Sequence, residues 1–161
     1  MVGMDETTRA IIDRITVTYD KPTKIPAGYL CQVFYDCARL TPNDLARLAA
    51  QATGHLPEQT FDLALGLAYS GIYFAAAVAG GREAAILQAD GKIYGPGLKG
   101  KKVVLVDDVV FSGARLLEAA RIAKEHGAEI AGYACIVDRS ENKLCTLLDK
   151  PLWSAFQAGL D

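Results

Sequence analysis

Two neighbouring aspartates, Asp107 and Asp108, directly follow the apolar run Val103–Val106. Adjacent carboxylates at the end of a strand can accept hydrogen bonds from vicinal sugar hydroxyls and can draw a divalent cation toward the same edge. The alternative is an ordinary strand-to-helix turn in which the acids cap the helix. Because two carboxylates at the end of an apolar strand repel each other, we favour the ligand-binding role.

The residues after the acid pair predict a phosphate-binding turn. A helix is expected from Arg115 to His126, so the turn lies at its N-terminus, where backbone N–H groups and the helix dipole favour an anion. Gly113 lets the backbone approach that anion closely. The pattern therefore predicts that a phosphorylated sugar binds at this strand end.

A strand, helix and strand unit positions these groups. Val103–Val106 is a continuous apolar strand, Gly127 closes the helix, and Ile130–Val137 is a second apolar strand. Elements in this order form a right-handed parallel crossover. Together with similar segments upstream, they predict an α/β fold with a doubly wound parallel sheet, whose ligands lie at the carboxyl ends of the strands.

Helix and strand signals also occur before this unit. Thr41 is expected to be a helix N-cap, with Pro42 at the first helical position and Asp44 three residues after the cap. Gln88–Lys102, with four glycines and four lysines, predicts an exposed, adjustable loop. The other helices expected are Met4–Ile15 and Gly71–Ala79, and the strands are Thr16–Tyr19, Tyr29–Tyr35, Phe61–Gly66 and Ala84–Leu87. Lys21-Pro22 and Pro26-Ala27-Gly28 are expected to separate the first two strands.

The composition indicates a single domain without a general affinity for polyanions. The chain has 161 residues, 51% of them hydrophobic, which is enough for one sizeable core. Its formal net charge of −2 gives no general attraction to nucleic acid or membranes. The uncharged segment Leu63–Gly81 is as long as a bilayer span, but its internal glycines favour a strand, a turn and a helix.

The cysteines and the N-terminal residues predict a cytoplasmic protein. Cys31, Cys37, Cys135 and Cys145 lack C-x-x-C spacing and are expected to be reduced thiols. The first nine residues are polar and charged, which fits neither a signal peptide nor a transit peptide.

The segment Val103–Leu116 resembles the phosphoribosyl-pyrophosphate (PRPP) loop of type I phosphoribosyltransferases, which joins an apolar strand, two acids, a short turn and a glycine. The resemblance implies one domain over residues 1–161, with a hood on the base side (about 1–40) and a core (about 41–161). It gives Asp107 and Asp108 a catalytic role on the ribose hydroxyls. It places the 5-phosphate in the turn formed by Val109, Val110, Phe111, Ser112, Gly113, Ala114 and Arg115.

Other segments resemble the bacterial orotate phosphoribosyltransferases within this family. Gly127–Glu141 is similar to the strand whose arginine meets the orotate carboxylate, a role that falls on Arg139 and suits a guanidinium. Phe34 and Tyr35 resemble an aromatic segment that lies against the base. Considered alone, the aromatic pair is more often core, and Arg139 is as often a surface residue. Phe61–Ala79 resembles the pyrophosphate-contacting region, which implies pyrophosphate binding by Ala68, Tyr69, Ser70 and Gly71.

The activity implied by this resemblance is transfer of ribose 5-phosphate from PRPP to orotate, giving orotidine 5-phosphate and pyrophosphate in pyrimidine nucleotide biosynthesis. The implied protein is a homodimer that uses Mg²⁺ and binds neither nucleic acid nor membranes. The metal would be held mainly by PRPP, near Asp107 and Asp108, rather than by direct protein ligands.

The sequence also departs from the family pattern. Ser70 stands where a lysine is usual and Phe111 where a threonine is usual, while Arg115 could replace lost hydroxyl contacts by a charge-assisted bond. The basic catalytic loop is shortened to Gln88–Lys92, in which Lys92 is the plausible catalytic cation, although a loop lysine is more often a solvated charge. Since such cations neutralise departing pyrophosphate, two alternatives remain. One is a PRPP- or nucleotide-binding protein with weak or no catalysis, and the other is a phosphoribosyltransferase for another base.

Overall fold

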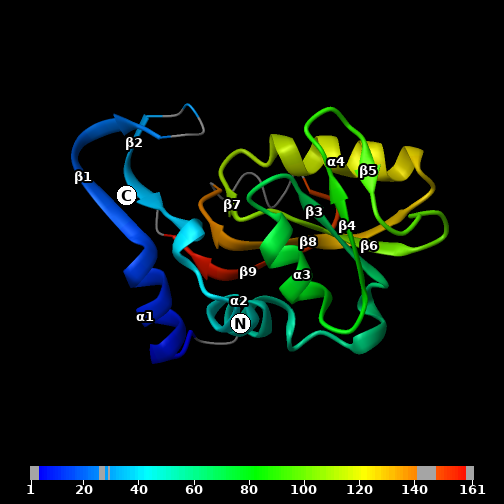
Figure 1. The fold of residues 1–161 in the computed structure, drawn as a ribbon, viewed down its shortest axis with the longest axis horizontal. Helices are drawn as coiled ribbons and strands as arrows, with labels where there is room; N and C mark the ends of the chain where they lie inside the picture. Colours follow the sequence, from blue (N-terminus) through cyan, green and yellow to red (C-terminus); the bar gives the residue numbers. More distant parts are fainter. Residues whose placement is uncertain (1–3, 26–27, 29, 141–147, 159–161) are drawn as a thin grey trace.

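The computed structural model describes residues 4–25, 28, 30–140 and 148–158 (Figure 1). Four α-helices, nine strands and two short 3-10 turns, Cys37–Arg39 and Glu58–Thr60, are formed by these residues. The helices are α1 (Glu6–Ile15), α2 (Pro42–Thr53), α3 (Ile72–Ala79) and α4 (Ala114–Glu125). The strands are β1 (Thr16–Lys24), β2 (Leu30–Tyr35), β3 (Leu63–Leu67), β4 (Glu83–Leu87), β5 (Ile93–Tyr94), β6 (Lys102–Val106), β7 (Val109–Val110), β8 (Glu129–Asp138) and β9 (Leu152–Gln157).

The central sheet is predominantly parallel. Its order is β5-β4-β3-β6-β8-β7, and β9 also pairs with β8. The pairs among β3, β4, β6, β7, β8 and β9 are parallel, and only β5 pairs antiparallel, with β4. Parallel strands joined by helical crossovers bring their carboxyl ends to one edge of the sheet. The predicted α/β fold with a parallel sheet is therefore confirmed.

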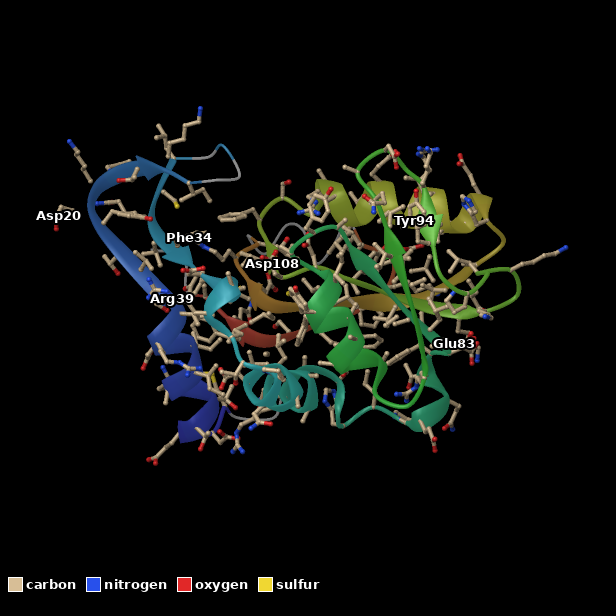
Figure 2. The ribbon with its side chains drawn as sticks, in the orientation of Figure 1. Asp20, Phe34, Arg39, Glu83, Tyr94 and Asp108 are labelled. Atoms are coloured by element: carbon tan, nitrogen blue, oxygen red, sulfur yellow. The ribbon has the colours of Figure 1, made fainter. Side chains whose placement is uncertain are left out.

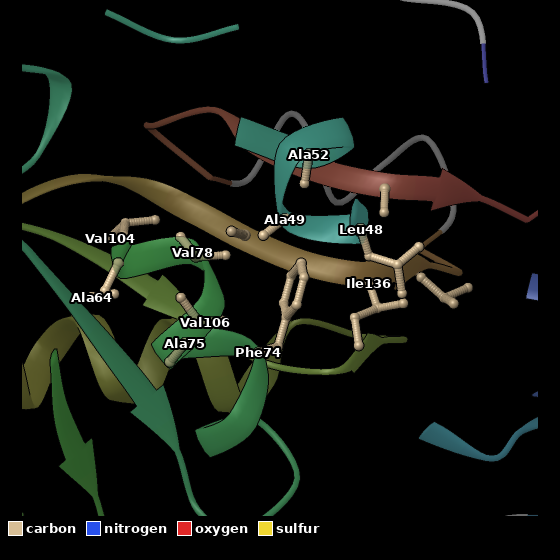
Figure 3. Packing of buried hydrophobic residues seen from close by; sticks show 14 of the residues in the cluster. Leu48, Ala49, Ala52, Ala64, Phe74, Ala75, Val78, Val104, Val106 and Ile136 are labelled. Atoms are coloured by element: carbon tan, nitrogen blue, oxygen red, sulfur yellow. The ribbon is translucent and has the colours of Figure 1, made fainter. Parts of the chain in front are cut away.

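Helices cover both faces of the sheet because strand side chains alternate between the faces. Ala64, Val104 and Val106 belong to the cluster formed with α1, α2 and α3, in which Phe74 is fully buried (Figure 3). Neighbouring residues on β3 and β6, such as Leu65, belong to the cluster on the α4 side. Both faces of the sheet are covered by the hydrophobic core. The carboxyl edge of the strands is therefore the part of the sheet that a ligand can reach.

The N-terminal segment forms a separate hairpin. β1 and β2 pair antiparallel in a two-stranded sheet, which lies beside the β7 end of the core (Figure 1). We predicted that Lys21-Pro22 would end the first strand, but β1 continues to Lys24. The register shifts between Thr18 and Thr23, so the proline falls at a bulge, where no ladder donor is required.

The loop predicted over Gln88–Lys102 is only partly irregular. It contains β5, which pairs with β4 and closes a short hairpin. Neither β5 nor β7 was predicted, because two-residue strands are too short to show a periodic pattern. The last strand, β9, was also missed; it pairs with β8 and contributes Ala155 to the core.

The uncharged segment Leu63–Gly81 forms β3, a turn and α3, as predicted. Within the described ranges, no helix is long and apolar enough to cross a membrane. Cys31, Cys37 and Cys135 are free thiols. Cys145, and Glu141 at the end of the segment compared with the family, lie outside the described residues.

Gly71 brings the turn after β3 into direct contact with the end of β6. A Cβ atom at this position would lie 2.5 Å from the Val106 carbonyl oxygen and 3.1 Å from the Asp107 Cα atom. Such approaches are too close for any residue larger than glycine without backbone movement. The segment Ala68–Gly71 therefore lies against the acid pair because position 71 has no side chain.

We expect Gly71→Ala to lower the free energy of unfolding by about 1–3 kcal/mol, because the added methyl group meets backbone atoms that cannot rotate away. Urea denaturation followed by circular dichroism measures the change. Gly97→Ala is the matched control, since a Cβ there meets nothing within 4 Å. Equal stability of the two variants would show that the contact between the turn and β6 is not tight.

Candidate active site

A cleft of about 750 Å³ lies between the hairpin and the carboxyl edge of the sheet. Three parts of the chain line it: residues 25 and 34–38, the turn residues Tyr69 and Ser70, and residues 107–116 with Arg139. Figure 2 labels Phe34 on the hairpin and Asp108 at the end of β6, on the two sides of this cleft. Most of the predicted binding residues, from segments far apart in the sequence, are thus brought to one place.

The acid pair is held rigidly at the end of β6. The Asp107 N–H donates to the Ala134 carbonyl oxygen at 3.1 Å, and the Asp108 carbonyl oxygen accepts from the N–H groups of Ile136 and Val137. The carboxylates also fix the local backbone, since Asp107 Oδ1 accepts from the Asp108 N–H at 2.9 Å. Strand pairing and these side-chain bonds together present both carboxyl groups to the cleft.

Burial makes Asp107 an unusual carboxyl group. The residue is only 3% exposed, and burial raises its pKa to about 7, against the lowering effect of the nearby Arg115 guanidinium. The Asp108 carboxylate beside it raises the pKa further. Such a group takes up a proton near neutral pH unless a ligand or cation compensates the charge.

The turn after the acids leads from β7 into α4. Gly113 is the N-cap of α4 with φ +75°, a left-handed conformation that favours glycine, and it has no side chain with which to cap the helix. The Ser112 hydroxyl oxygen accepts from the Ala114 N–H at 3.3 Å. The first N–H groups of a helix have no intrahelical acceptor, so this turn can receive an anion.

Arg115 links the turn to the segment after β3. One guanidinium nitrogen, Nη2, donates to the Ala68 carbonyl oxygen at 2.9 Å, and Nη1 lies 3.5 Å from Asp107 Oδ2. Ala68 itself does not line the cleft but a side hollow of about 530 Å³, to which Arg115 also contributes. Tyr69 and Ser70, by contrast, line the cleft, and Gly71 acts through its close packing against β6.

Arg139 lies on the hairpin side of the cleft. Its Nη1 donates to the Val33 carbonyl oxygen at 2.7 Å. The guanidinium carbon lies 5.4 Å from the ring centre of Tyr35 and 4.8 Å from that of Phe111. Phe34 lines the same region. A guanidinium held between two rings presents its remaining N–H groups in one plane, as bidentate carboxylate recognition requires.

Lys92 is not among the residues that line the cleft. It lies in the short β4–β5 hairpin, where its ammonium is 3.8 Å from Asp90 and its side chain is 71% exposed. The Gln88 N–H donates to the Lys92 carbonyl oxygen at 2.8 Å, which closes the hairpin. Within one chain, therefore, the catalytic role of Lys92 stays a prediction that its position does not support.

The sequence interpretation missed five lining residues: Ile25, Asp36, Cys37, Ala38 and Leu116. Burial raises the pKa of the Cys37 thiol, and the carboxylates of Asp108, Asp36 and Asp107 raise it further. Cys37 therefore lines the cleft as a neutral thiol at physiological pH. Its only sequence signal was its place directly after the Phe34-Tyr35-Asp36 segment.

A metal ion would find few protein ligands here. In the part of the chain that the structure describes, no group of three or more His, Cys, Asp or Glu side chains could hold a metal ion. The acid pair nevertheless offers the hard oxygen donors that Mg²⁺ prefers.

A parallel sheet that carries an acid pair and a turn at a helix N-terminus at one strand end is an α/β domain whose cleft can accept a phosphorylated sugar. Comparison with known proteins points to one family. Residues 87–149 match the model of the phosphoribosyl transferase domain. Orotate phosphoribosyltransferase of Nocardioides sp. is 34% identical over 108 residues (62% of this chain and 60% of the relative). That of Acinetobacter baylyi is 31% identical over 134 residues (73% of this chain and 62% of the relative).

Solved structures show the same fold. Orotate phosphoribosyltransferase of Mycobacterium tuberculosis in complex with PRPP superposes with a TM-score of 0.73 at 20% identity, covering 94% of each chain. UMP synthase of Leishmania donovani gives 0.77 at 22% identity, covering 94% of this chain and 36% of the other. The chain is therefore similar to phosphoribosyltransferases in sequence and in fold, and it spans less than two thirds of the length of the curated relatives that it matches.

The raised pKa of Asp107 predicts a pH-dependent stability. The folded protein holds this proton to a higher pH than the unfolded chain, so the stabilising contribution is present at low pH and is lost as the pH rises toward 7. Relative to the unsubstituted protein, we expect Asp107→Asn to gain about 2 kcal/mol of stability between about pH 5 and about pH 8.

Urea denaturation at the two pH values measures this gain. Asp20→Asn, which replaces an exposed carboxylate on the hairpin, is the control and should show no such gain. A constant difference between Asp107→Asn and the unsubstituted protein would mean that Asp107 is already ionised at about pH 5.

Proposed function

We propose that this protein transfers ribose 5-phosphate from PRPP to orotate, giving orotidine 5-phosphate and pyrophosphate, and so serves pyrimidine nucleotide biosynthesis. One observation carries the proposal: the acid pair, the Gly113 turn and Arg139 line a single cleft. A cleft of about 750 Å³ is within the usual range for small-molecule sites. The relatives named orotate phosphoribosyltransferase support the choice of acceptor.

The core side of the cleft holds the ribose 5-phosphate in this proposal. Asp107 and Asp108 accept hydrogen bonds from the two ribose hydroxyls, which requires Asp107 to lose the proton that burial favours. The 5-phosphate lies against the backbone N–H groups of the turn of residues 109–115, at the positive end of α4. The two contacts fix the sugar at both ends, so the anomeric carbon faces the hairpin side of the cleft.

The hairpin side of the cleft holds the base. Arg139 pairs with the orotate carboxylate, and the Val33 carbonyl and two aromatic rings keep its guanidinium in place. Phe34 lies against the flat face of the base, where an aromatic ring stacks favourably. The base nitrogen then attacks the anomeric carbon of the ribose.

The reaction forms one bond to the anomeric carbon and breaks one, and the proton of the base nitrogen passes to the released pyrophosphate. The bond from the anomeric carbon to nitrogen forms, and the bond from that carbon to the pyrophosphate oxygen breaks, with its electron pair leaving on pyrophosphate. Asp107 and Asp108 would lie near a Mg²⁺ ion carried mainly by PRPP, and such an ion would neutralise charge on the leaving group. The protein contributes position and electrostatic complementarity, and the hairpin limits access of water to the cleft.

The proposal includes a homodimer in the cytoplasm. The free thiols of Cys31, Cys37 and Cys135 support a reducing compartment. Dimerisation rests on the family resemblance, in which the catalytic loop reaches the neighbouring subunit. In such a dimer the exposed β4–β5 hairpin is the part of this chain through which Lys92 would act.

A second candidate function is binding of PRPP or a nucleotide with little or no catalysis. The position of Lys92 favours this second function. Lys92 is the cation that the sequence assigned to the leaving pyrophosphate, and it does not line the cleft. Calorimetry that shows micromolar binding together with no release of pyrophosphate would support this function over the first. A third candidate, transfer to another base, differs from the first only in what Arg139 contacts.

The direct test is an assay of orotate consumption with PRPP and Mg²⁺. We expect turnover by the unsubstituted protein and loss of at least about a hundredfold in the Asp107→Asn/Asp108→Asn double variant, since both hydroxyl contacts are weakened. Asp20→Asn should retain full turnover, because this exposed residue lies on the hairpin and does not line the cleft. Turnover no higher than that of the double variant would remove the catalytic proposal.

Arg139→Ala tests the base assignment. We expect the KM for orotate to rise by about tenfold to a hundredfold with little change in the KM for PRPP, because only the carboxylate contact is removed. Arg139→Lys keeps the charge but not the planar guanidinium. Its KM for orotate should lie between those of the unsubstituted protein and Arg139→Ala. Unchanged orotate affinity in Arg139→Ala would contradict the assignment, and a screen of other bases would follow.

A further inference from the structure

Two cationic side chains, Arg115 and Arg139, are present among the described residues that line the cleft. Arg139 is held on the hairpin side by the Val33 carbonyl and two aromatic rings. Arg115 is the cation on the core side, beside the turn that follows β3. The two arginines are therefore assigned to different parts of the ligand by their positions.

The contacts of Arg115 place it between two segments that face the ligand. It starts in the first turn of α4, and its guanidinium reaches across to the Ala68 carbonyl at 2.9 Å. Ser70, two residues further along that segment, lines the cleft but carries no charge. Arg115 also lines both the cleft and the adjoining side hollow. Its positive charge thus lies beside Ala68–Gly71, the segment predicted to contact pyrophosphate. This segment contains no cationic residue of its own.

We propose that Arg115 binds the departing pyrophosphate and carries the role that sequence reasoning gave to Lys92. The inference rests on the proposed function and names the cation that this reaction requires. A leaving pyrophosphate gains negative charge as the carbon–oxygen bond breaks, and a guanidinium within reach of both segments stabilises that charge.

In the absence of a ligand, the contacts of Arg115 are weak enough for its guanidinium to move from Asp107 to pyrophosphate. Its side chain is 55% exposed, and its distance to Asp107 Oδ2, 3.5 Å, is longer than that of a tight charge-assisted hydrogen bond. A pyrophosphate group offers more negative charge than one carboxylate and several acceptor oxygens. When Arg115 turns to this group, Asp107 remains beside the ribose hydroxyls, which then donate to its carboxylate.

Calorimetric titration with inorganic pyrophosphate and Mg²⁺, and separately with ribose 5-phosphate, tests the proposal without requiring turnover. In Arg115→Ala we expect pyrophosphate binding to weaken by about tenfold to a hundredfold, as for loss of a charged hydrogen bond, and ribose 5-phosphate binding by less than about threefold. Arg115→Lys should recover part of the loss, because the charge is retained.

Arg121→Ala is the matched control on the same helix, since Arg121 pairs with Glu118 and Glu125 on the exposed face. It should bind both ligands as the unsubstituted protein does. Equal weakening of both ligands in Arg115→Ala would place Arg115 at the 5-phosphate and overturn the proposal. Unchanged pyrophosphate binding, or none measurable in the unsubstituted protein, would also overturn it.

The two proposals fail separately. A protein that binds pyrophosphate through Arg115 but does not consume orotate would retain this inference and lose the proposed reaction. Conversely, a protein that consumes orotate while Arg115→Ala leaves pyrophosphate binding unchanged would keep the reaction and lose the role of Arg115.

Discussion

The site depends on a carboxyl group that the fold keeps away from water. Asp107 follows a strand whose last four residues are buried, and its backbone is paired with β8, so the residue is held at the buried edge of the sheet. Burial alone would favour the neutral acid, whereas the Arg115 guanidinium favours the ionised one. The opposition of these effects brings the pKa of Asp107 close to neutral pH, so the group can gain or lose a proton there.

The two sides of the cleft come from parts of the chain that fold in different ways. The core side is the edge of a parallel sheet with helices on both faces, and its geometry follows from buried packing. The hairpin side is a two-stranded sheet, and Arg139 connects it to the core through the Val33 carbonyl and the ring of Phe111. Phe111 stands where the family usually has a threonine, so a position in the phosphate turn here contacts the arginine assigned to the base.

The shortened segment after β4 has a structural consequence beyond the loss of basic residues. Gln88 and Lys92 close a tight hairpin onto β5, which fixes the segment at the edge of the sheet. The surface next to Ala68 is left as a hollow lined in part by Arg115. A cation on the first turn of a core helix is held in position by packing, whereas a cation on a long loop must first be ordered.

The sequence by itself determined the elements whose signals are local. The apolar run Val103–Val106 and Gly113 predicted the strand and the turn, and the Thr41 capping box formed as expected. Hydrophobic periodicity and capping act over a few residues, so one chain segment contains the whole signal.

Only the tertiary structure decided which distant groups meet. The contact of Arg115 with Ala68 spans 47 residues, and that of Arg139 with Val33 spans 106. The pairing of β7 and β9 with β8 and the exclusion of Lys92 from the cleft depend on the same long-range packing. Such contacts are set by how elements pack in space, and no local pattern records them.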